Sequence, residues 1–304
     1  MGAYVQLVWT RGVVLSPHRG THPLFTQDQV AQIVATVKES EPIEHDLPGY
    51  NWSIKKLRRW VKQVFRCEVS RRTLYKILKE NRLSWKKCQK VLKKADRAKR
   101  AAYIQEFQAT FALVCQEKIR LVYIDESHFH RDMDLGYTWT EKGKPAWRLS
   151  DCPPLKDRID WYGAYDFSNG QCFIWNEHGC NGENTVKFLN HLVAWLGPAT
   201  CPTVIVWDGA PCHKAKLVQD AAAALGFIFL PLPGYSPDLN PIEGLWKWMR
   251  EDVTQNHCYA TMRELFDACK AFVDRINADP LQIISRLWPK FELDPEFEEL
   301  LLSK

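Results

Sequence analysis

Two apolar runs, each followed at once by an aspartate, constrain the fold of this chain more than any other feature. The run at residues 119–124 leads to Asp125, and the run at 203–207 leads to Asp208. A stretch that is apolar at every position, such as 204–207, is typical of a strand buried on both faces beneath helices. Open α/β sheets place their sites where such strands end. The sequence therefore predicts an α/β domain in which both aspartates emerge at one edge of a sheet.

The other predicted elements continue this alternation of strands and helices. Strands are predicted at residues 119–125, 159–167, 172–175, 203–208 and 227–230. Helices are predicted at 95–115, 185–196 and 214–225 from apolar residues at helical spacing. Two further helices begin at Pro241 and at Thr261, where Thr261 and Glu264 match a capping box. Five strands with helices between them predict a sheet flanked by helices.

A third acid, Glu243, opens the helix that begins at Pro241, after a loop at 231–240 that three prolines stiffen. One interpretation is local, because Asn240 as N-cap and Glu243 at the third helical position form a variant capping box. The other is functional, because Glu243 lies off the apolar stripe of its helix and need not point into the core. Together with Asp125 and Asp208 it supplies six hard oxygens, which suit divalent cations and phosphodiester chemistry.

Positive charge is concentrated in residues 51–100. This segment holds 19 Lys and Arg against three acids, a balance of +16, so the rest of the chain carries −11 of the net +5. Two short amphipathic helices with Ser53 and Ser70 as N-caps, separated by a tight turn, predict a helix-turn-helix. A solvated charged face on a structural helix pair is the alternative. It explains mixed charges but not this excess, which favours a nucleic-acid partner.

The helix-turn-helix prediction gives the basic residues separate tasks, because the start of the second helix enters the major groove in such motifs. Residues expected there are Arg71, Arg72, Thr73 and Lys76. Residues of the first helix expected to hold phosphates are Lys55, Arg58, Arg59 and Lys62. Lys86 and Lys87 begin a strip expected to follow the DNA backbone, with binding that weakens steeply as salt rises.

The ten cysteines are never spaced as Cys-x-x-Cys, so no zinc knuckle or redox pair is predicted. Scattered thiols without a secretory signal fit a reducing cytosol and packing roles. The longest apolar stretch is too short to span a bilayer. We therefore expect a cytoplasmic protein with no membrane partner.

Four motifs resemble those of DDE transposases from the insertion-sequence branch of the mariner-related superfamily. They are residues 123–127 (YIDES), 136–139 (GYTW), 207–214 (WDGAPCHK) and 232–243 (LPGYSPDLNPIE). The 34 residues between Asp208 and Glu243 match the spacing of this branch. The resemblance extends over about residues 26–271, and the last motif is highly specific.

The resemblance implies a ribonuclease-H-like mixed sheet flanked by helices, preceded by a small helix-turn-helix domain. It implies a catalytic triad of Asp125, Asp208 and Glu243 that binds two Mg²⁺ or Mn²⁺ ions, and double-stranded DNA as the substrate. A homodimer is expected, because two transposon ends must be brought together. His213 and Lys214 follow the second aspartate, within reach of the scissile phosphate or the DNA backbone, although His213 also fits a polar helix start.

The chain is accordingly divided into four parts. Residues 1–24 are a linker or the remnant of an upstream helix-turn-helix that related transposases commonly carry, so this copy is expected to be shortened. Residues 25–94 form the helix-turn-helix domain, 95–118 a connecting helix, and 119–304 the catalytic domain with C-terminal helices. The main prediction is a metal-dependent transposase. The alternatives are a non-catalytic DNA-binding protein derived from one, and a ribonuclease-H-like nuclease without a joining step.

Overall fold

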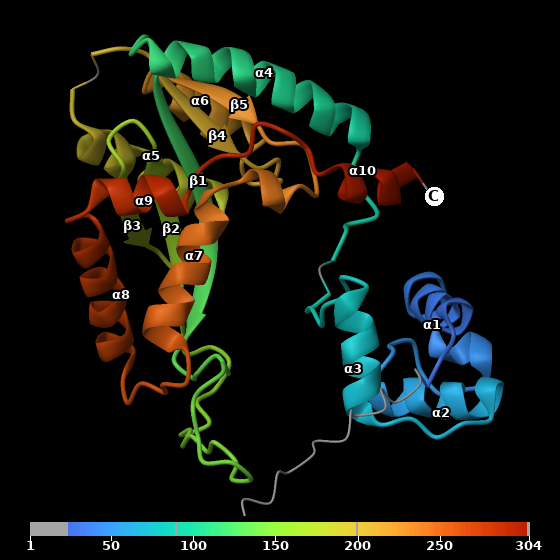
Figure 1. The fold of residues 1–304 in the computed structure, drawn as a ribbon. Coiled ribbons are helices and arrows are strands. Elements are labelled where there is room, and N and C mark those ends of the chain that lie inside the picture. The colour runs from blue at the N-terminus through green and yellow to red at the C-terminus, as the bar shows by residue number, and fades with distance from the viewer. Residues whose placement is uncertain (1–23, 89, 199, 303–304) are drawn as a thin grey trace, which may run out of the picture. The chain divides into compact units, whose positions relative to one another are not determined.

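The computed structural model describes residues 24–88, 90–198 and 200–302, which form two compact units (Figure 1). The second unit begins at Lys90, and each unit has a hydrophobic core of its own. The expectation for residues 1–24 falls outside the described residues, except at Leu24.

The described part of the first unit is helical. Its elements are α1 (Gln27–Glu39), a 3-10 turn η1 (Pro42–His45), α2 (Ile54–Phe65) and α3 (Arg71–Glu80). The predicted N-caps are confirmed, since Ser53 Oγ accepts from Lys56 N at 3.3 Å and Ser70 Oγ accepts from Thr73 N at 3.0 Å. The amphipathic faces of these helices share a core of Ile33, Leu57, Trp60, Val61, Leu74 and Ile77. The expected pair of helices across a tight turn is therefore present.

The second unit is built on a five-stranded mixed sheet. Its strands are β1 (Arg120–His130), β2 (Arg158–Asp166), β3 (Gln171–Asn176), β4 (Thr203–Trp207) and β5 (Phe227–Pro231), in the order β3-β2-β1-β4-β5. β1 pairs antiparallel to β2, which pairs antiparallel to β3, whereas β1 pairs parallel to β4, and β4 parallel to β5. All five strands were predicted from the sequence, and the mixed sheet confirms the expected fold class.

Helices cover both faces of this sheet (Figure 1). Its helical elements are α4 (Arg97–Cys115), α5 (Gly182–Leu196), α6 (Lys216–Ala224), η2 (Pro237–Leu239), α7 (Ile242–Met249), the π-helical turn η3 (Arg250–Thr254), α8 (Met262–Ile276), α9 (Pro280–Arg286) and α10 (Pro295–Leu302). α5 and α6 pack on one face, while α4, α7, α8 and α9 pack on the other. Across the described ranges, no helix combines the length and the apolar character needed to cross a membrane.

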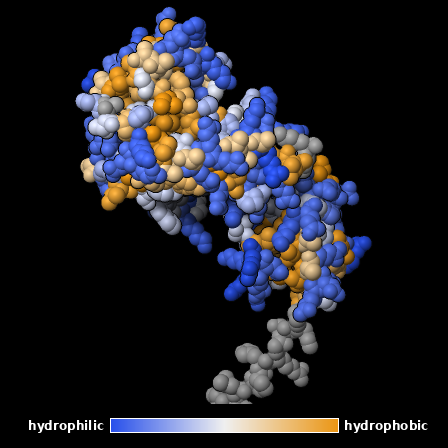
Figure 2. All heavy atoms as spheres, turned by 90° about the horizontal axis from the view of Figure 1, so that it is seen from above, coloured by the Kyte–Doolittle hydropathy of each residue, from blue (hydrophilic) through white to orange (hydrophobic). Residues whose placement is uncertain are grey.

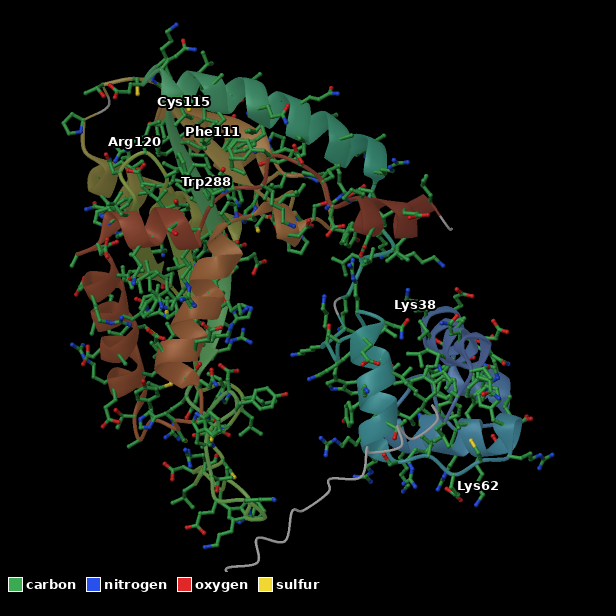
Figure 3. The ribbon with its side chains drawn as sticks, viewed as in Figure 1. Lys38, Lys62, Phe111, Cys115, Arg120 and Trp288 are labelled. Atoms are coloured by element: carbon green, nitrogen blue, oxygen red, sulfur yellow. The ribbon has the colours of Figure 1, made fainter. Side chains whose placement is uncertain are left out.

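Aromatic rings hold α4 against the rest of the second unit (Figure 3). In the predicted apolar stripe of this helix, Ile104 and Phe107 are buried, and Phe111 and Val114 are partly buried. The ring centroid of Phe111 lies 4.7 Å from that of Phe291 and 6.2 Å from that of Trp288. The helix therefore belongs to the core of the unit that carries the sheet.

Three local expectations were wrong. β1 does not end at Asp125 but continues to His130, because residues 126–130 stay paired to β2 after the pairing with β4 has stopped. α6 begins at Lys216 rather than Lys214, because turns occupy residues 211–214. The cysteines are free thiols, and among the described ones only Cys172 and Cys269 are buried, so packing is not their general role.

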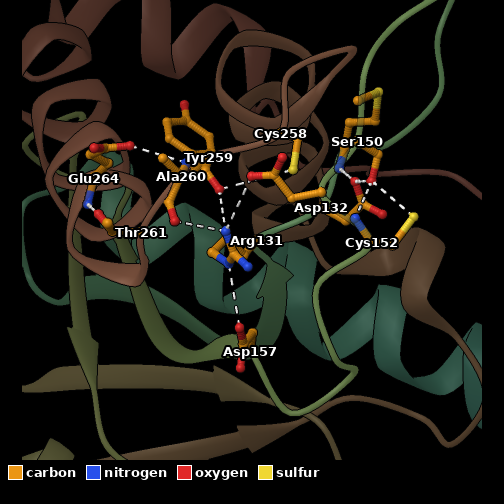
Figure 4. Close-up of polar contacts among 12 residues, drawn as sticks. Arg131, Asp132, Ser150, Cys152, Asp157, Cys258, Tyr259, Ala260, Thr261 and Glu264 are labelled. Carbon is orange, nitrogen blue, oxygen red and sulfur yellow. Dashed lines mark hydrogen bonds and ion pairs between the residues drawn. The ribbon is translucent and has the colours of Figure 1, made fainter.

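The loop between β1 and β2, residues 131–157, is tied down at its base by Arg131 (Figure 4). The Arg131 guanidinium donates to the carbonyl oxygens of Tyr259 and Ala260, both at 2.7 Å, and faces the Asp157 carboxylate at 3.4 Å. These contacts join the two ends of the loop to the segment that leads into α8.

Beyond its base, this loop carries apolar side chains that are open to solvent. Tyr137 and Trp139, from the motif at 136–139, are both 100% exposed. Apolar residues show elsewhere on the surface of the larger unit as well, among a majority of hydrophilic ones (Figure 2). The motif therefore does not serve the core of the sheet domain.

Candidate active site

The strand register places Asp125 and Asp208 level with one another. The last parallel pair between β1 and β4 is Tyr123 with Val206. Asp125 lies two residues after Tyr123, and Asp208 lies two residues after Val206. Side chains alternate between the faces of a strand, so Asp125 follows Tyr123 to the face covered by α4 and α7. Asp208 continues the alternation of Val206 beyond the end of β4. The predicted sheet edge therefore forms at the end of β4, where Asp208 leaves the sheet. It does not form at Asp125, because β1 continues to His130.

Glu243 reaches the two aspartates from the layer of helices that covers this face of the sheet. It lies in the first turn of α7, whose buried residues Ile242, Leu245 and Trp246 pack on this face of the sheet. All three predicted acids line one cavity of about 860 Å³. The rest of its wall includes Lys99, Lys214 and the loop at 231–237. The structure thus brings together three carboxylates that are far apart in the sequence.

Asp125 is held by Trp246, whose indole nitrogen Nε1 donates to Asp125 Oδ2 at 3.0 Å. Burial raises the pKa of Asp125 well above its usual value, and the nearby charges of Glu243 and Glu126 raise it further, against the indole hydrogen bond. Trp246 lies on the apolar face of α7, and an indole N–H that is buried needs an acceptor.

Gly163 makes the approach of Trp246 possible. It is the residue of β2 directly opposite Asp125, and a Cβ placed on it would lie 2.4 Å from Trp246 Cη2 and 2.5 Å from Cζ2. The indole therefore lies against bare backbone at this position. A glycine in the middle of a strand is the sequence signal for such a close approach.

The Glu243 carboxylate makes no hydrogen bond or ion pair with any other described residue, so the capping interpretation is not realised. α7 starts after Pro241 without a side-chain cap, and Asn240 Oδ1 is buried without a partner. Partial loss of hydration raises the pKa of Glu243, Arg250 lowers it, and the charge of Asp208 raises it. Glu243 therefore points a free carboxylate into the cavity.

Asp208 is held differently, by the imidazole of His213. Its Oδ1 lies 2.7 Å from His213 Nδ1 and also accepts from Ala210 N at 3.0 Å. The hydrogen bond from His213 is the main cause that lowers the pKa of Asp208. On its other side, His213 Nε2 lies 2.9 Å from Glu126 Oε1. Burial lowers the pKa of His213, but the hydrogen bonds to Asp208 and Glu126 outweigh this and raise it to about 9.

The sequence left two roles open for His213, a contact with DNA and a polar helix start. Its side chain is only 3% exposed and lies beneath the surface between two carboxylates. Two acceptors attract the ring more strongly than solvent does, so the turn after β4 folds it inward. Lys214, the next residue, is exposed and lines the cavity.

The donor set fits a divalent cation of the Mg²⁺ or Mn²⁺ type, because all three acids offer hard oxygens. Burial, and after it the charges of neighbouring acids, raises the pKa of Asp125 and of Glu243, and a bound cation would relieve the repulsion between these acids. Within the described residues, however, no three His, Cys, Asp or Glu side chains are gathered closely enough to hold a metal. The three acids face one cavity without forming a closed set of ligands.

The loop that precedes Glu243 is fixed by Arg100, which the sequence did not reveal as a site residue. Arg100 is fully buried, and its guanidinium donates to Asp238 Oδ1 and Oδ2 at 2.9 and 3.0 Å. Its Nε donates to Glu298 Oε1 at 2.8 Å. Asp238 belongs to η2, one turn before α7, so this pairing fixes the start of the helix that carries Glu243. The available signal was an arginine that continues the apolar stripe of α4 through Ile104.

The predicted DNA-contacting residues of the first unit lie mostly on its surface. Those exposed are Lys55, Arg59, Lys62, Arg71, Arg72, Lys76, Lys86 and Lys87. Thr73 is half-buried, with its hydroxyl 2.9 Å from that of Ser70. Arg58 is half-buried as well, and its Nε donates to Val69 O at 2.8 Å, which braces the turn between α2 and α3. The start of α3 therefore presents two exposed arginines, Arg71 and Arg72, that form no ion pair with another described residue, while Arg58 is engaged within the unit.

Comparisons with known protein families place matches on both units. Residues 120–266 match the family described as DDE superfamily endonuclease. Residues 48–107 match the family described as winged helix-turn helix. Among curated proteins, the "Insertion element IS630 uncharacterized 39 kDa protein" of Shigella sonnei is 20% identical over 254 residues, which are 83% of this chain and 73% of that protein.

Similar solved structures are complexes of the Mos1 transposase. The Mos1 strand transfer complex has a TM-score of 0.62 at 18% identity, over 95% of this chain and 81% of that one. The Mos1 mariner paired end complex with Mn has a TM-score of 0.63 at 15% identity, with the same coverage. The corresponding complex with Mg has a TM-score of 0.61 at 16% identity, over 96% and 82%. At these identities the likeness establishes the fold, which is ribonuclease-H-like after a helical N-terminal region.

Proposed function

We propose that this chain is a transposase that binds the ends of its element and cleaves and joins DNA strands. The match of residues 120–266 to the DDE superfamily of endonucleases supports this proposal. The observation that carries this proposal is the convergence of Asp125, Asp208 and Glu243 on one cavity. They come from two strands and a helix, and no structural contact in the described residues accounts for the free carboxylate of Glu243. Burial and the charges of neighbouring acids raise the pKa of Asp125 and of Glu243, and carboxylates gathered in this way favour a site built for cations.

Asp125, Asp208 and Glu243 would hold the metal ions, Mg²⁺ or Mn²⁺, and two are expected at a site of this chemistry. Mos1 complexes with Mn and with Mg support this choice of ions. When bound, such ions lower the pKa of the attacking hydroxyl and stabilise the leaving oxygen of an in-line displacement. The chain contributes the orientation of the ligands, since Trp246 holds Asp125 and His213 holds Asp208.

Two lysines on the cavity wall suit a phosphodiester substrate. Lys99 and Lys214 are exposed and line the same cavity as the acids. Their ammonium groups can bind phosphate oxygens on either side of the scissile bond, as point charges that do not impose a base sequence. Cleavage then consists of attack on phosphorus by water with loss of the DNA 3′-oxygen, and joining repeats the displacement with that 3′-hydroxyl as the nucleophile.

The first unit would supply recognition of the element ends. Its helix-turn-helix presents Arg71 and Arg72 at the start of α3, where bidentate contacts with guanine are available in the major groove. The concentration of charge in residues 51–100 adds contacts to the DNA backbone. Two chains would act together to bring two element ends together, and the Mos1 transposase paired-end complex with a transposon end supports this proposal.

The decisive experiment is a cleavage assay on labelled duplexes that carry the repeats flanking the element, with Mn²⁺ and with EDTA. We expect Mn²⁺-dependent nicking by the wild type, no nicking by Asp208→Asn, and equal DNA binding by both. Glu243→Gln tests the third ligand, because Gln keeps the size of the side chain while removing its charge. Strand-transfer products would distinguish a transposase from a simple nuclease.

A matched control separates recognition from chemistry. Arg71→Ala with Arg72→Ala should abolish binding to the repeats, while weak Mn²⁺-dependent nicking of supercoiled plasmid persists. Binding to the repeats without any cleavage by the wild type, in either metal, would refute the proposed enzyme and leave a DNA-binding protein derived from a transposase.

A further inference from the structure

His213 is a buried polar side chain next to the cavity that the proposed mechanism uses only in passing. Its ring is 3% exposed, although it follows a turn at the end of the sheet where side chains usually reach solvent. Both ring nitrogens face oxygen acceptors, Asp208 Oδ1 at 2.7 Å and Glu126 Oε1 at 2.9 Å. Both nitrogens therefore act as donors, and the imidazole links the two carboxylates across the end of the sheet.

The sheet explains why such a link is needed. Asp208 follows the last paired residue of β4, so no ladder hydrogen bond restrains it, and its side chain is 52% exposed. An aspartate in this setting samples several rotamers unless a neighbour restricts it. Glu126 projects from the opposite face of β1 to Asp125, and so it can reach the imidazole without entering the cavity.

The position of the imidazole is itself well determined. The turn at 211–214 closes through a hydrogen bond from His213 N to Ala210 O at 3.1 Å. The ring lies against Trp207, with centroids 3.9 Å apart, and Gln219 Nε2 donates to His213 O at 2.7 Å. The backbone and the ring of His213 are both held in place, so the ring can orient a more mobile neighbour.

The two hydrogen bonds on Asp208 are not shared equally between its oxygens. Oδ1 accepts from His213 Nδ1 and from Ala210 N, whereas no hydrogen bond to Oδ2 is found within the described residues. We propose that His213, braced by Glu126, is a positioning residue that locks Asp208 so that Oδ2 alone is presented to the metal. This inference rests on the proposed function, because it concerns the same site.

Two substitutions of His213 separate this role from simple packing. In His213→Asn the amide nitrogen takes the place of Nδ1 and keeps a donor to Asp208, while the bond to Glu126 is lost. In His213→Gln the amide nitrogen takes the place of Nε2, so the donor to Asp208 is lost instead. Both substitutions replace the imidazole ring with a neutral amide, so they perturb packing to a similar degree.

The primary readout is Mn²⁺ affinity, measured by electron paramagnetic resonance on the full chain without DNA. We expect Mn²⁺ to bind roughly 10- to 100-fold more weakly to His213→Gln, the usual cost of losing the partner of a metal ligand. His213→Asn keeps the donor to Asp208 but loses the contact with Glu126, so its Mn²⁺ affinity should fall by a smaller factor than that of His213→Gln. In cleavage assays, the Mn²⁺ concentration for half-maximal rate should rise more in His213→Gln than the rate at saturating Mn²⁺ falls.

Several outcomes would overturn the inference. Wild-type Mn²⁺ affinity in His213→Gln would show that Asp208 needs no lock, and equal losses in both variants would assign His213 to packing. If His213→Gln does not fold, Glu126→Gln tests the same link, because its amide oxygen still accepts from Nε2 but carries no charge. Mn²⁺ binding should then weaken by a smaller factor, and an unchanged affinity would refute the bracing role.

Failure of the proposed function would look different. In that case the wild type would bind no Mn²⁺, and Asp208→Asn would match it. Binding by the wild type that Asp208→Asn abolishes, with no effect of His213→Gln, would reject the lock alone.

Discussion

Gly163→Ala is a small substitution that should disturb the candidate site strongly. The added methyl group would lie 2.4 Å from Trp246 Cη2, whereas carbon atoms in contact normally stay about 3.5–4.0 Å apart. The indole must therefore move by roughly 1 Å, or β2 must bend away from it. Such a movement breaks the hydrogen bond from Trp246 Nε1 to Asp125, because a bond of 3.0 Å stretched that far no longer exists.

The size of the effect follows from these two consequences. Overpacking a dense core costs about 1–3 kcal/mol, and losing a hydrogen bond to a charged group costs about 1.5–3 kcal/mol. The two costs are not fully additive, because an indole that moves relieves the clash but loses the hydrogen bond. The free energy of unfolding is therefore expected to fall by about 3 kcal/mol. For a unit of this size each kcal/mol shifts Tm by about 2–4 °C, which gives a decrease of roughly 6–12 °C.

A double-mutant cycle with Trp246→Phe tests the cause. The phenyl ring lacks the second ring that carries Cη2 and Cζ2, so Gly163→Ala should cost less than about 1 kcal/mol in that background. Free energies of unfolding from denaturant titrations of the four proteins give the coupling, expected at about 2 kcal/mol. Mn²⁺-dependent cleavage by Gly163→Ala should fall with the loss of the Asp125 contact. Additive free energies would refute the close approach of indole and backbone as the reason for a glycine here.

Two further predictions concern buried charges. Burial raises the pKa of Asp125, so the folded protein holds this proton more tightly than the unfolded chain does. The resulting contribution to stability is fully present below the pKa of an unfolded aspartate, about 4, and is lost as the pH rises through the folded-state pKa. The Asn side chain of Asp125→Asn does not titrate, so in EDTA this variant should become more stable than the wild type as the pH rises, and it should lose cleavage. Free energies of unfolding from urea titrations that change in parallel with pH in the two proteins would contradict this. Arg100→Met should lower the free energy of unfolding by about 3–5 kcal/mol, because Asp238 and Glu298 lose their buried cation. The exposed Arg97→Met on the same helix serves as its control, and equal effects of the two changes would show that the buried pairing contributes nothing.

Local sequence determined much of the fold. Apolar runs and apolar stripes predicted all five strands and the helices between them, because periodicity reports directly on which faces are buried. The N-caps at Ser53, Ser70 and Thr261 were predicted for the same kind of reason, since a side chain that caps a helix acts within three residues. The likeness of short motifs to a known family indicated the three acids.

The ends of strands and the contact partners of side chains were harder to predict from the sequence. The continuation of β1 beyond Asp125 depends on pairing with β2, some thirty residues away, and nothing within residues 126–130 announces it. The choice between capping and a free carboxylate at Glu243 was also open, because both interpretations fit the same tetrapeptide.

The sequence by itself determined the fold class, the helix-turn-helix with its excess of positive charge, and the identity of the acids at the candidate site. Only the tertiary structure decided how those acids are held. The contacts of Trp246 with Asp125, of His213 with Asp208 and of Arg100 with Asp238 join residues 5 to 138 positions apart. Hydrogen bonds of this kind depend on side-chain direction across packed layers, whereas periodicity records only burial along one element. For that reason the sequence left open whether His213 reaches DNA or only starts a helix, and the tertiary structure places its ring between two carboxylates.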